Sequence, residues 1–539
     1  MSAHSLAEAP LWRGFSRVEG RASLWGPAFF SARAQRPSGP APDLPLSRIV
    51  SASLFGVDGV AVEVEVRVSS QLPRVDIVGL PAAAVRESAA RVRAAIAAVG
   101  QRFPERRVTV NLAPADLRKT GASLDLAIAI GVLTACGAIE TDAGAQTAFV
   151  GELALDGRLR PLRGALALAL AARDCGCKQL IAPDASAAEA ALTPDLDVRA
   201  APDLGAVLRH LLGAESLPRA EPVRAPDARG PRLDLADVRG QEGAKRALEI
   251  AAAGGHALLL RGAPGSGKTM LAARLEGLLP ELDDEEALEV TRIHGVAGSL
   301  RGALARERPF RAPHHTASAA GLLGGGNPPR PGEISLAHRG VLFLDELPEF
   351  ERRALESLRQ VLEERRVVVA RAGASCVFPA DFQLVAAMNP CPCGWRGAPQ
   401  RDCRCDDAAV ARYGARISGP LLDRIDLHVS VLPVAWHQLE APANTASATP
   451  ATRERVAAAR ARQRARGAAN ARLRDAELET AAHATPDATR LLGRAFERLG
   501  LSARAARRAL RVARTIADLA GEPQVEAPAM AEALGFRGA

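Results

Sequence analysis

The chain has 539 residues, of which 48% are hydrophobic and 24% charged, with a formal net charge of +8. This composition excludes a disordered chain, and the length exceeds what one hydrophobic core supports, so we expect three or more domains. The longest apolar run, residues 165–172, falls short of the roughly 18 residues that a bilayer span needs. We therefore expect no membrane segment.

Residues 1–46 show no periodic pattern and are predicted to be a disordered extension. A transit peptide or a start codon placed too early would explain this segment as well. The eight cysteines occur without a secretory signal, which indicates a reducing compartment, and we expect the cytoplasm. The small positive charge is compatible with a polyanionic partner without identifying one.

Residues 47–214 are predicted to form a first α/β domain. Valines alternate with other residues along 60–68, which is typical of a strand buried on one face. A helical pattern follows over residues 82–99 and a further strand over 107–111. Residues 215–232 are rich in Pro, Arg, Ala and Asp without periodicity, which indicates a linker.

Residues 233–432 alternate apolar strands with helical segments, a pattern typical of a parallel sheet with crossover helices. A second linker is predicted over residues 433–450. Residues 451–539 are rich in Ala, Arg and Leu, and we expect them to form a helical domain.

A Walker A phosphate-binding loop lies between a short apolar strand at 257–260 and a helix. Its glycines let backbone N–H groups surround phosphates, Lys268 reaches the β- and γ-phosphates, and Thr269 is a ligand of Mg²⁺. The pattern predicts binding of ATP with Mg²⁺. Its residues are Gly262, Ala263, Pro264, Gly265, Ser266, Gly267, Lys268 and Thr269.

Two acidic residues follow the apolar strand at 341–344, as in a Walker B motif. Asp345 is expected to hold Mg²⁺, and Glu346 to orient the attacking water. A third apolar strand ends at Asn389, which is predicted to contact the γ-phosphate. An asparagine that only closes a turn with Pro390 is the alternative for this position.

Several longer motifs resemble the magnesium-chelatase-like AAA+ ATPases of the YifB/ComM type. The resemblance spans nearly all of residues 48–519. It is carried by IVGLP at 77–81, TVNLAPADL at 109–117, RAPHHT at 311–316, RPGEISLAH at 330–338, NPCPCG at 389–394, SGPLLDRIDL at 418–427 and ARTIADL at 513–519.

The resemblance implies a hexameric ring that binds ATP between subunits. Arg424 matches the arginine finger, whose guanidinium stabilises the charge on a neighbour's γ-phosphate. Arg504 matches the sensor-2 position of a C-terminal helical lid domain, with Arg507 and Arg511 as competitors. The long separation between Walker A and Walker B is attributed to a helix-2 insertion, with a mobile loop at 324–326.

The resemblance also implies a function, because members of this family are linked to branch migration of DNA during natural transformation. The leading expectation is therefore a DNA translocase or helicase acting on branched or single-stranded DNA. A protein-remodelling or chelatase-type motor without DNA activity is the alternative.

The segment GELALDGR at 151–158, followed by Pro161 and Gly164, resembles the proteolytic domain of Lon, an S5-like α+β fold with a Ser-Lys dyad. Leu166 stands where the catalytic lysine would fall, and leucine cannot act as a base. We therefore expect no protease activity from Ser123. A displaced dyad between Ser123 and the nearby Lys119 remains the alternative.

Four cysteines form a C-x-C, nine-residue gap, C-x-C array, and four thiolates complete a tetrahedral shell for structural Zn²⁺. The C-x-C spacing is tighter than the usual C-x₂₋₄-C of zinc sites, so a loop of reduced thiols is the alternative. The four residues are Cys391, Cys393, Cys403 and Cys405.

Three further signals are less specific. In an extended segment, His314 and His315 would point to opposite faces, so a shared metal is not expected. Eight arginines occur between Arg453 and Arg474, and they indicate either phosphate contacts or a solvated helix. Arg371, in a hairpin predicted over 367–378, is a candidate for contact with DNA.

Overall fold

The computed structural model describes residues 46–119, 121–139, 146–223, 233–299, 303–371, 374–399, 401–434 and 448–537. These residues form two units, each with its own core. The first unit consists of the chain up to Ser53, Gly59–Leu162 and Leu168–Ala220. The second unit consists of Leu54–Asp58, Arg163–Ala167 and Glu221–Ala539.

Parts of three predicted segments lie outside the described residues. Of the extension predicted at 1–46, only Leu46 is described, as the first residue of a strand. Residues 224–232 of the first predicted linker and 435–447 of the second are also outside. The last helical domain begins in the structure with a helix at Thr449.

The first unit is built on a seven-stranded mixed sheet, with strand order β3-β4-β2-β1-β5-β8-β9. Strand β2 pairs with β4 in antiparallel fashion, whereas β1, β5, β8 and β9 run parallel. The alternating valines of β2 are buried on one face, as the period of two predicts. The strands are β1 Leu46–Phe55, β2 Asp58–Ser69, β3 Arg74–Val78, β4 Arg107–Ala113, β5 Thr147–Phe149, β6 Glu152–Leu153, β7 Leu159–Arg160, β8 Gln179–Pro183 and β9 Asp197–Ala201.

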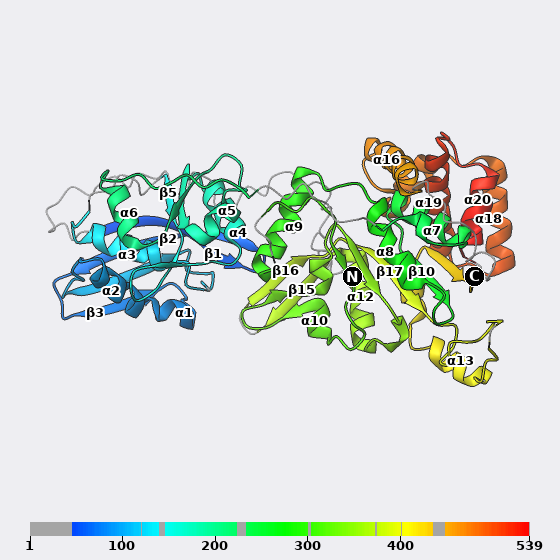
Figure 1. Ribbon diagram of the computed structural model, residues 1–539, viewed down its shortest axis with the longest axis horizontal. Helices are drawn as coiled ribbons and strands as arrows, with labels where there is room; N and C mark the ends of the chain where they lie inside the picture. The colour runs from blue at the N-terminus through cyan, green and yellow to red at the C-terminus, as the bar shows by residue number, and fades with distance from the viewer. Residues whose placement is uncertain are drawn as a thin grey trace, which may run out of the picture. The chain divides into compact units, whose positions relative to one another are not determined.

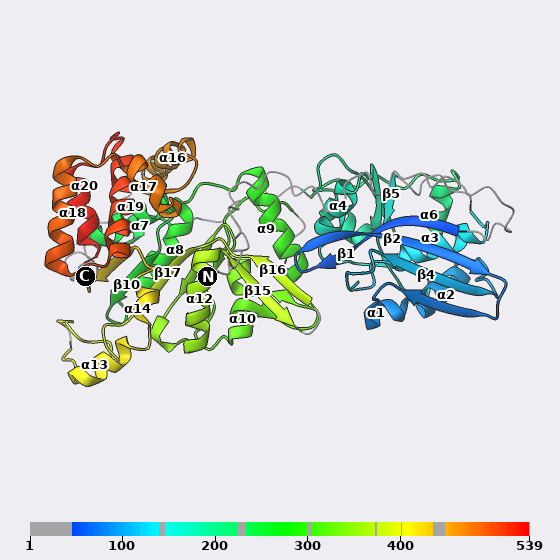
Figure 2. The same cartoon turned by 180° about the vertical axis from the view of Figure 1, so that it is seen from behind.

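The helices of the first unit cover this sheet (Figure 2). Helix α3 is apolar and buried on nearly every side, and it packs against α2. The helices are α1 Ala83–Arg86, α2 Ser88–Ala98, α3 Asp125–Ala135, α4 Ala165–Asp174, α5 Asp184–Ala190 and α6 Leu204–Leu211.

The second unit contains a five-stranded sheet, β11-β14-β17-β10-β18, in which all strands run parallel. Strands β14 and β17 are buried along their whole length, as expected for a sheet covered on both faces. The parallel α/β core predicted from the sequence is therefore confirmed. Its strands are β10 Leu258–Gly262, β11 Phe310–Arg311, β14 Val341–Leu344, β17 Gln383–Met388 and β18 Leu427–Val431.

Helices and two small hairpins complete this core. The glycines expected to form a mobile loop lie in a short antiparallel ladder, where β12 (Gly324–Gly325) pairs with β13 (Arg330–Pro331). Strands β15 (Arg366–Arg371) and β16 (Ala374–Pro379) form the predicted hairpin. The helices are η3 Leu235–Asp237, α7 Glu242–Gly254, α8 Lys268–Leu278, α9 Asp284–Ala297, α10 Ala319–Leu323, α11 Glu333–Leu336, η4 Leu347–Glu349, α12 Arg352–Glu364, α13 Asp407–Gly414 and α14 Gly419–Leu422.

The C-terminal residues of the second unit are helical, as predicted. They gather beside α7 (Figure 1), and their apolar residues share one hydrophobic core with it. The helices are α16 Thr449–Ala465, η5 Asn470–Arg472, α17 Asp475–Ala482, α18 Pro486–Leu499, α19 Ala503–Ala520 and α20 Ala527–Gly535. Within the described ranges, none of the helices combines the length and the apolar character that a membrane span requires.

Candidate nucleotide site

The Walker A residues form a tight loop between β10 and α8. Gly265 and Gly267 have φ angles of +75° and +93°, a conformation that side chains disfavour. A Cβ atom on Gly262 would lie 2.3 Å from the carbonyl oxygen of Val431 on the neighbouring strand. The glycines are therefore required by the local backbone, and they leave the N-terminus of α8 open towards the loop.

Lys268 is the first residue of α8 and is only 9% exposed. Its Nζ donates to the carbonyl oxygens of Gly262 and Ala263, each at 2.9 Å, and to Oδ1 of Asn389 at 3.2 Å. Burial lowers the pKa of Lys268, against the raising effect of the carboxylates of Asp345 and Glu346. Bound phosphates would favour the charged ammonium, so the lysine is suited to an anionic ligand.

Thr269 and Asp345 meet across the sheet edge. The Thr269 hydroxyl donates to Oδ2 of Asp345 at 2.7 Å, although 76 residues separate them in sequence. This contact arises because β10 and β14 both flank β17, which brings the carboxyl ends of these strands to one edge. A hydroxyl and a carboxylate are oxygen donors of the kind that Mg²⁺ prefers, so the two residues fit a magnesium ion.

Glu346 follows Asp345 in the left-handed conformation, with a φ angle of +53°. Nδ1 of His315 lies 3.2 Å from its carboxylate. Both residues line a cavity of about 350 Å³ together with Thr269 and Asp345. The sequence analysis did not find this partner for Glu346, because it depends on the pairing of β11 with β14.

The condition under which His314 and His315 would point to opposite faces, an extended segment, is not met. Their ring centroids lie 4.1 Å apart, with 33° between the ring planes. The reason is that β11 ends at Arg311, and the chain turns at His315 and Thr316 instead of continuing as a strand.

Asn389 directly follows β17, the strand between Walker A and Walker B. Its side chain accepts a hydrogen bond from Lys268, so it faces the phosphate loop. Beside it, residues 263–267 line a cavity of about 400 Å³ with Val238, Met270 and Trp395. The size and the mixed apolar and backbone lining suit a nucleotide.

Arg424 and Arg504 line a different cavity, to which no residue of the phosphate loop contributes. Arg424 is 6% exposed and is held by Glu363 and by the carbonyl of Pro420, at 2.6 Å. None of the described hydrogen bonds joins Arg424 to Lys268 of the same chain. Arg507 and Arg511, the competitors of Arg504, both bind Asp475.

A buried polar network connects α19 to the core beneath these arginines. The carboxylate of Asp426 lies 3.1 Å from Nδ1 of His256 and 2.7 Å from Arg508, and Nε2 of His256 lies 2.7 Å from the Thr515 hydroxyl. Burial alone would raise the pKa of Asp426, but the hydrogen bond from His256 and the charge of Arg508 hold it well below its usual range. This network was not predicted from the sequence, because its members lie far apart in the chain.

Four sulfur atoms gather beside the phosphate loop. Sγ of Cys391 lies 3.4 Å from that of Cys393 and 3.6 Å from that of Cys403, and all four ligand atoms of the cluster lie within 4.8 Å of one another. The remaining member is Cys405. This arrangement is compatible with the zinc site expected from the sequence.

Ser123 and Lys119 of the first unit do not form a dyad. The Ser123 hydroxyl donates to the carbonyl oxygen of Ala52 at 2.9 Å, and Lys119 donates to the carbonyl of Pro114. Lys119 is 2% exposed, and burial lowers its pKa. Neither side chain donates to the other among the described residues.

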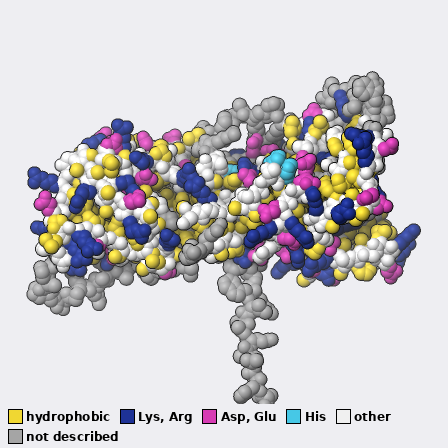
Figure 3. Space-filling view, turned by 90° about the horizontal axis from the view of Figure 1, so that it is seen from below, with side chains coloured by type: hydrophobic (Ala, Val, Ile, Leu, Met, Phe, Trp, Pro, Cys, Tyr) yellow, Lys and Arg dark blue, Asp and Glu magenta, His cyan; other side chains and the backbone are white. Residues whose placement is uncertain are grey.

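The arginine-rich helix α16 packs along one face and exposes the other, so a contact of its arginines with phosphates stays a prediction. Val456, Ala459 and Gln463 are buried, and the helix lies against α7 and α19. Most of the arginines bind within the unit, for example Arg455 to Glu249 at 2.6 Å. On the face shown in Figure 3, basic side chains are interspersed with acidic ones.

Three family models match the chain, and all describe parts of magnesium chelatase. Their descriptions are subunit ChlI of Mg-chelatase for residues 64–186, magnesium chelatase subunit ChlI for 234–439, and the ChlI C-terminal region for 446–537. A parallel sheet with a phosphate loop at its edge and a helical C-terminal domain has the layout of an AAA+ ATPase.

Similarity over nearly the full length defines the family. The competence protein ComM of Haemophilus influenzae is 45% identical over 91% of this chain and 97% of its own length. A Mycobacterium tuberculosis protein is 44% identical over 91% and 98%, and YifB of Escherichia coli 43% over 91% and 97%. The chain belongs to the YifB/ComM family of magnesium-chelatase-like AAA+ ATPases, which confirms the resemblance and implies ATPase activity.

Proposed function

We propose that this chain is an ATP-driven ring motor that acts on DNA in the cytoplasm. In this proposal it moves the branch point of branched or single-stranded DNA intermediates during natural transformation and recombination. The relative from Haemophilus influenzae is named a competence protein, which makes DNA the first partner to test.

The proposal rests mainly on the separation of two sets of charged residues. Lys268 and Asp345 lie at one sheet edge, whereas Arg424 and Arg504 line another cavity. Phosphoryl transfer is fastest when an arginine supplements the lysine and Mg²⁺. A second copy that presents Arg424 and Arg504 to this edge would complete the site, and repeated contacts of this kind close into a ring, here a hexamer.

Each residue of the site has a role in this proposal. The loop 262–267 and Lys268 hold the phosphates, and Thr269 with Asp345 holds Mg²⁺. Glu346 orients the attacking water, and Asn389 senses the γ-phosphate. Mg²⁺ would supply charge neutralisation at the β- and γ-phosphates when bound. The geometry that favours these roles is the contact of Lys268 with Asn389 and of Thr269 with Asp345.

The first experiment measures branch migration of a synthetic Holliday junction by the purified protein with ATP and Mg²⁺. We expect migration by the wild type and by Glu454→Gln, an exposed charge change on α16, and none by Glu346→Gln. If the wild type hydrolyses ATP but neither binds nor moves branched DNA, the DNA motor is wrong and a protein-remodelling motor becomes the leading function.

A second experiment tests the shared site. Lys268→Ala and Arg424→Ala should each abolish ATP hydrolysis alone. A mixture of the two variants should recover part of it, because some sites would combine an intact phosphate loop with an intact arginine. No recovery, in mixtures shown by light scattering to form joint oligomers, would contradict a site shared between copies.

A further inference from the structure

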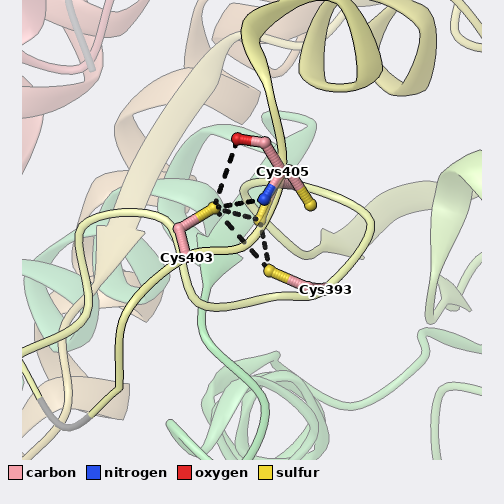
Figure 4. Close-up of side chains that lie close together, drawn as sticks. Cys393, Cys403 and Cys405 are labelled. Atoms are coloured by element: carbon pink, nitrogen blue, oxygen red, sulfur yellow. Dashed lines mark hydrogen bonds between the residues drawn. The ribbon is translucent and has the colours of Figure 1, made fainter.

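The four clustered cysteines come from two segments that flank one loop. Cys391 and Cys393 lie just after β17, and Cys403 and Cys405 lie just before α13. Figure 4 shows the sulfur atoms of Cys393 and Cys403 directed towards each other, with the backbone of Cys405 in contact with the sulfur of Cys403. The loop therefore folds back so that its two ends present thiols to each other.

The spacing of the sulfur atoms fits a single tetrahedral ion. Zn–S bonds of about 2.3 Å place the corners of a tetrahedral thiolate shell about 3.8 Å apart. The Sγ separations are 3.4 Å for Cys391 to Cys393, 3.6 Å for Cys391 to Cys403 and 3.7 Å for Cys393 to Cys403, and Sγ of Cys405 lies within 4.8 Å of the other three. A disulfide requires about 2.05 Å, and an iron–sulfur cluster would hold its thiolates further apart because its own atoms lie between them.

Backbone N–H groups are directed at the sulfur atoms, as is usual where thiolates are stabilised. The amide of Cys405 donates to Sγ of Cys403 at 3.5 Å. The amides of Trp395 and Arg404 donate to the sulfur of Cys393. Cys391 is fully buried. Four sulfur atoms this close together, with amide donors beside two of them, form a ligand set that one cation can occupy.

The cysteine loop is joined to the nucleotide site at three points. Asn389, which receives the hydrogen bond of Lys268, stands two residues before Cys391. Gly394 lies so close to the phosphate loop that a Cβ atom on it would be 2.6 Å from Cδ of Pro264. Trp395 lines the same cavity as the phosphate loop.

We propose that Cys391, Cys393, Cys403 and Cys405 bind one Zn²⁺, and that this ion fixes Asn389 and Trp395 against the phosphate loop. Binding converts the thiols to thiolates and releases their protons to solvent. Without the ion, the like charges or the unpaired thiols would separate, and Asn389 would lose its fixed position beside Lys268.

The test begins with the metal content of the full-length protein. We expect about one zinc per chain by mass spectrometry of the metal, retained by Cys136→Ser, whose thiol is exposed and outside the cluster. Cys403→Ser should lose most of the zinc. Because this variant could also unfold, Co²⁺ replaces zinc in the wild type, where four thiolates should give the strong visible absorption of a tetrahedral cobalt site.

Folded protein without zinc and without the cobalt spectrum would overturn the metal site, as would stoichiometric iron. The coupling to the nucleotide site rests on the proposed ATPase and is measured separately. Removing zinc from folded wild type should lower kcat/KM for ATP by about tenfold or more, since small displacements of positioning groups are costly. Zinc that can be removed without any change in kcat/KM would overturn the coupling and leave the metal site standing.

Discussion

The chain contains two buried lysines with lowered pKa values, and their surroundings differ. Lys268 stands between Gly267 and Thr269, each of which lines a cavity, and carboxylates oppose the effect of its burial. Lys119 is almost inaccessible and donates to a backbone carbonyl, while the neighbouring Ser123 donates elsewhere. The lowered pKa therefore reflects burial at both lysines. Only Lys268 also lies beside accessible cavities and residues that could take part in catalysis.

The largest expected effect separates these two lysines directly. Lys268→Met should reduce kcat for ATP hydrolysis by about 100- to 1000-fold, as the loss of a positioned donor on a charged transition state does. Lys119→Met should leave hydrolysis unchanged. The measurement is phosphate release by both variants at saturating ATP. Loss of hydrolysis in a folded Lys119→Met variant would break the comparison.

The second comparison concerns Asp426, a carboxylate that stays ionised although it is buried. Asp426→Asn removes the partner of His256 and Arg508, and should lower the free energy of unfolding of the second unit by about 2–4 kcal/mol. The control Asp487→Asn breaks an exposed pair with Arg490, so its effect should stay below about 1 kcal/mol. Chemical denaturation of both variants is the measurement.

The same network predicts a dependence on pH. The pKa of Asp426 is lower in the folded state than in the unfolded state, where it is about 3.9. Its contribution to stability is therefore complete above this value and is lost as the pH falls through the folded pKa. The stability difference between wild type and Asp426→Asn should narrow below about pH 4. A difference that widens in acid would contradict this assignment.

A smaller effect is expected where His315 holds Glu346. Releasing the half-exposed carboxylate of Glu346 from this contact should raise basal ATP hydrolysis by about two- to tenfold in His315→Ala, since the contact competes with the attacking water. His314→Ala is the matched control, because His314 bonds to Thr316 instead. Equal rates in both variants would show that His315 does not restrain Glu346.

The smallest effect is expected at Ser123. Ser123→Ala removes one hydrogen bond to a backbone carbonyl, so the unfolding free energy should fall by about 1 kcal/mol. No cleavage of casein should be detected in the wild type or the variant. Cleavage by wild type that disappears in Ser123→Ala would restore the protease alternative.

The sequence predicted the features that depend on neighbouring residues. The phosphate loop follows from glycines between a strand and a helix, and the apolar runs before Asp345 and Asn389 identify buried strands. The pair of His315 with Glu346 could not be predicted, because it requires the pairing of two strands 30 residues apart. The contacts of α16 could likewise not be predicted, since the partners of its arginines lie on distant helices.

For the four cysteines, the sequence allowed only part of the prediction. Their spacing allowed either a metal or free thiols, and only the path of the loop brings all four sulfur atoms together. The predicted domain boundaries and the catalytic roles of individual residues stay predictions.

The network around Asp426 has a mechanical consequence for a motor. Moving the C-terminal helices away from the sheet would separate the buried carboxylate of Asp426 from Arg508, which costs about 3–5 kcal/mol, and would also separate His256 from the Thr515 hydroxyl. In the proposed ring, the sheet and these helices would therefore move together as one rigid body. The conformational changes that follow ATP hydrolysis would then occur at the interfaces between neighbouring copies.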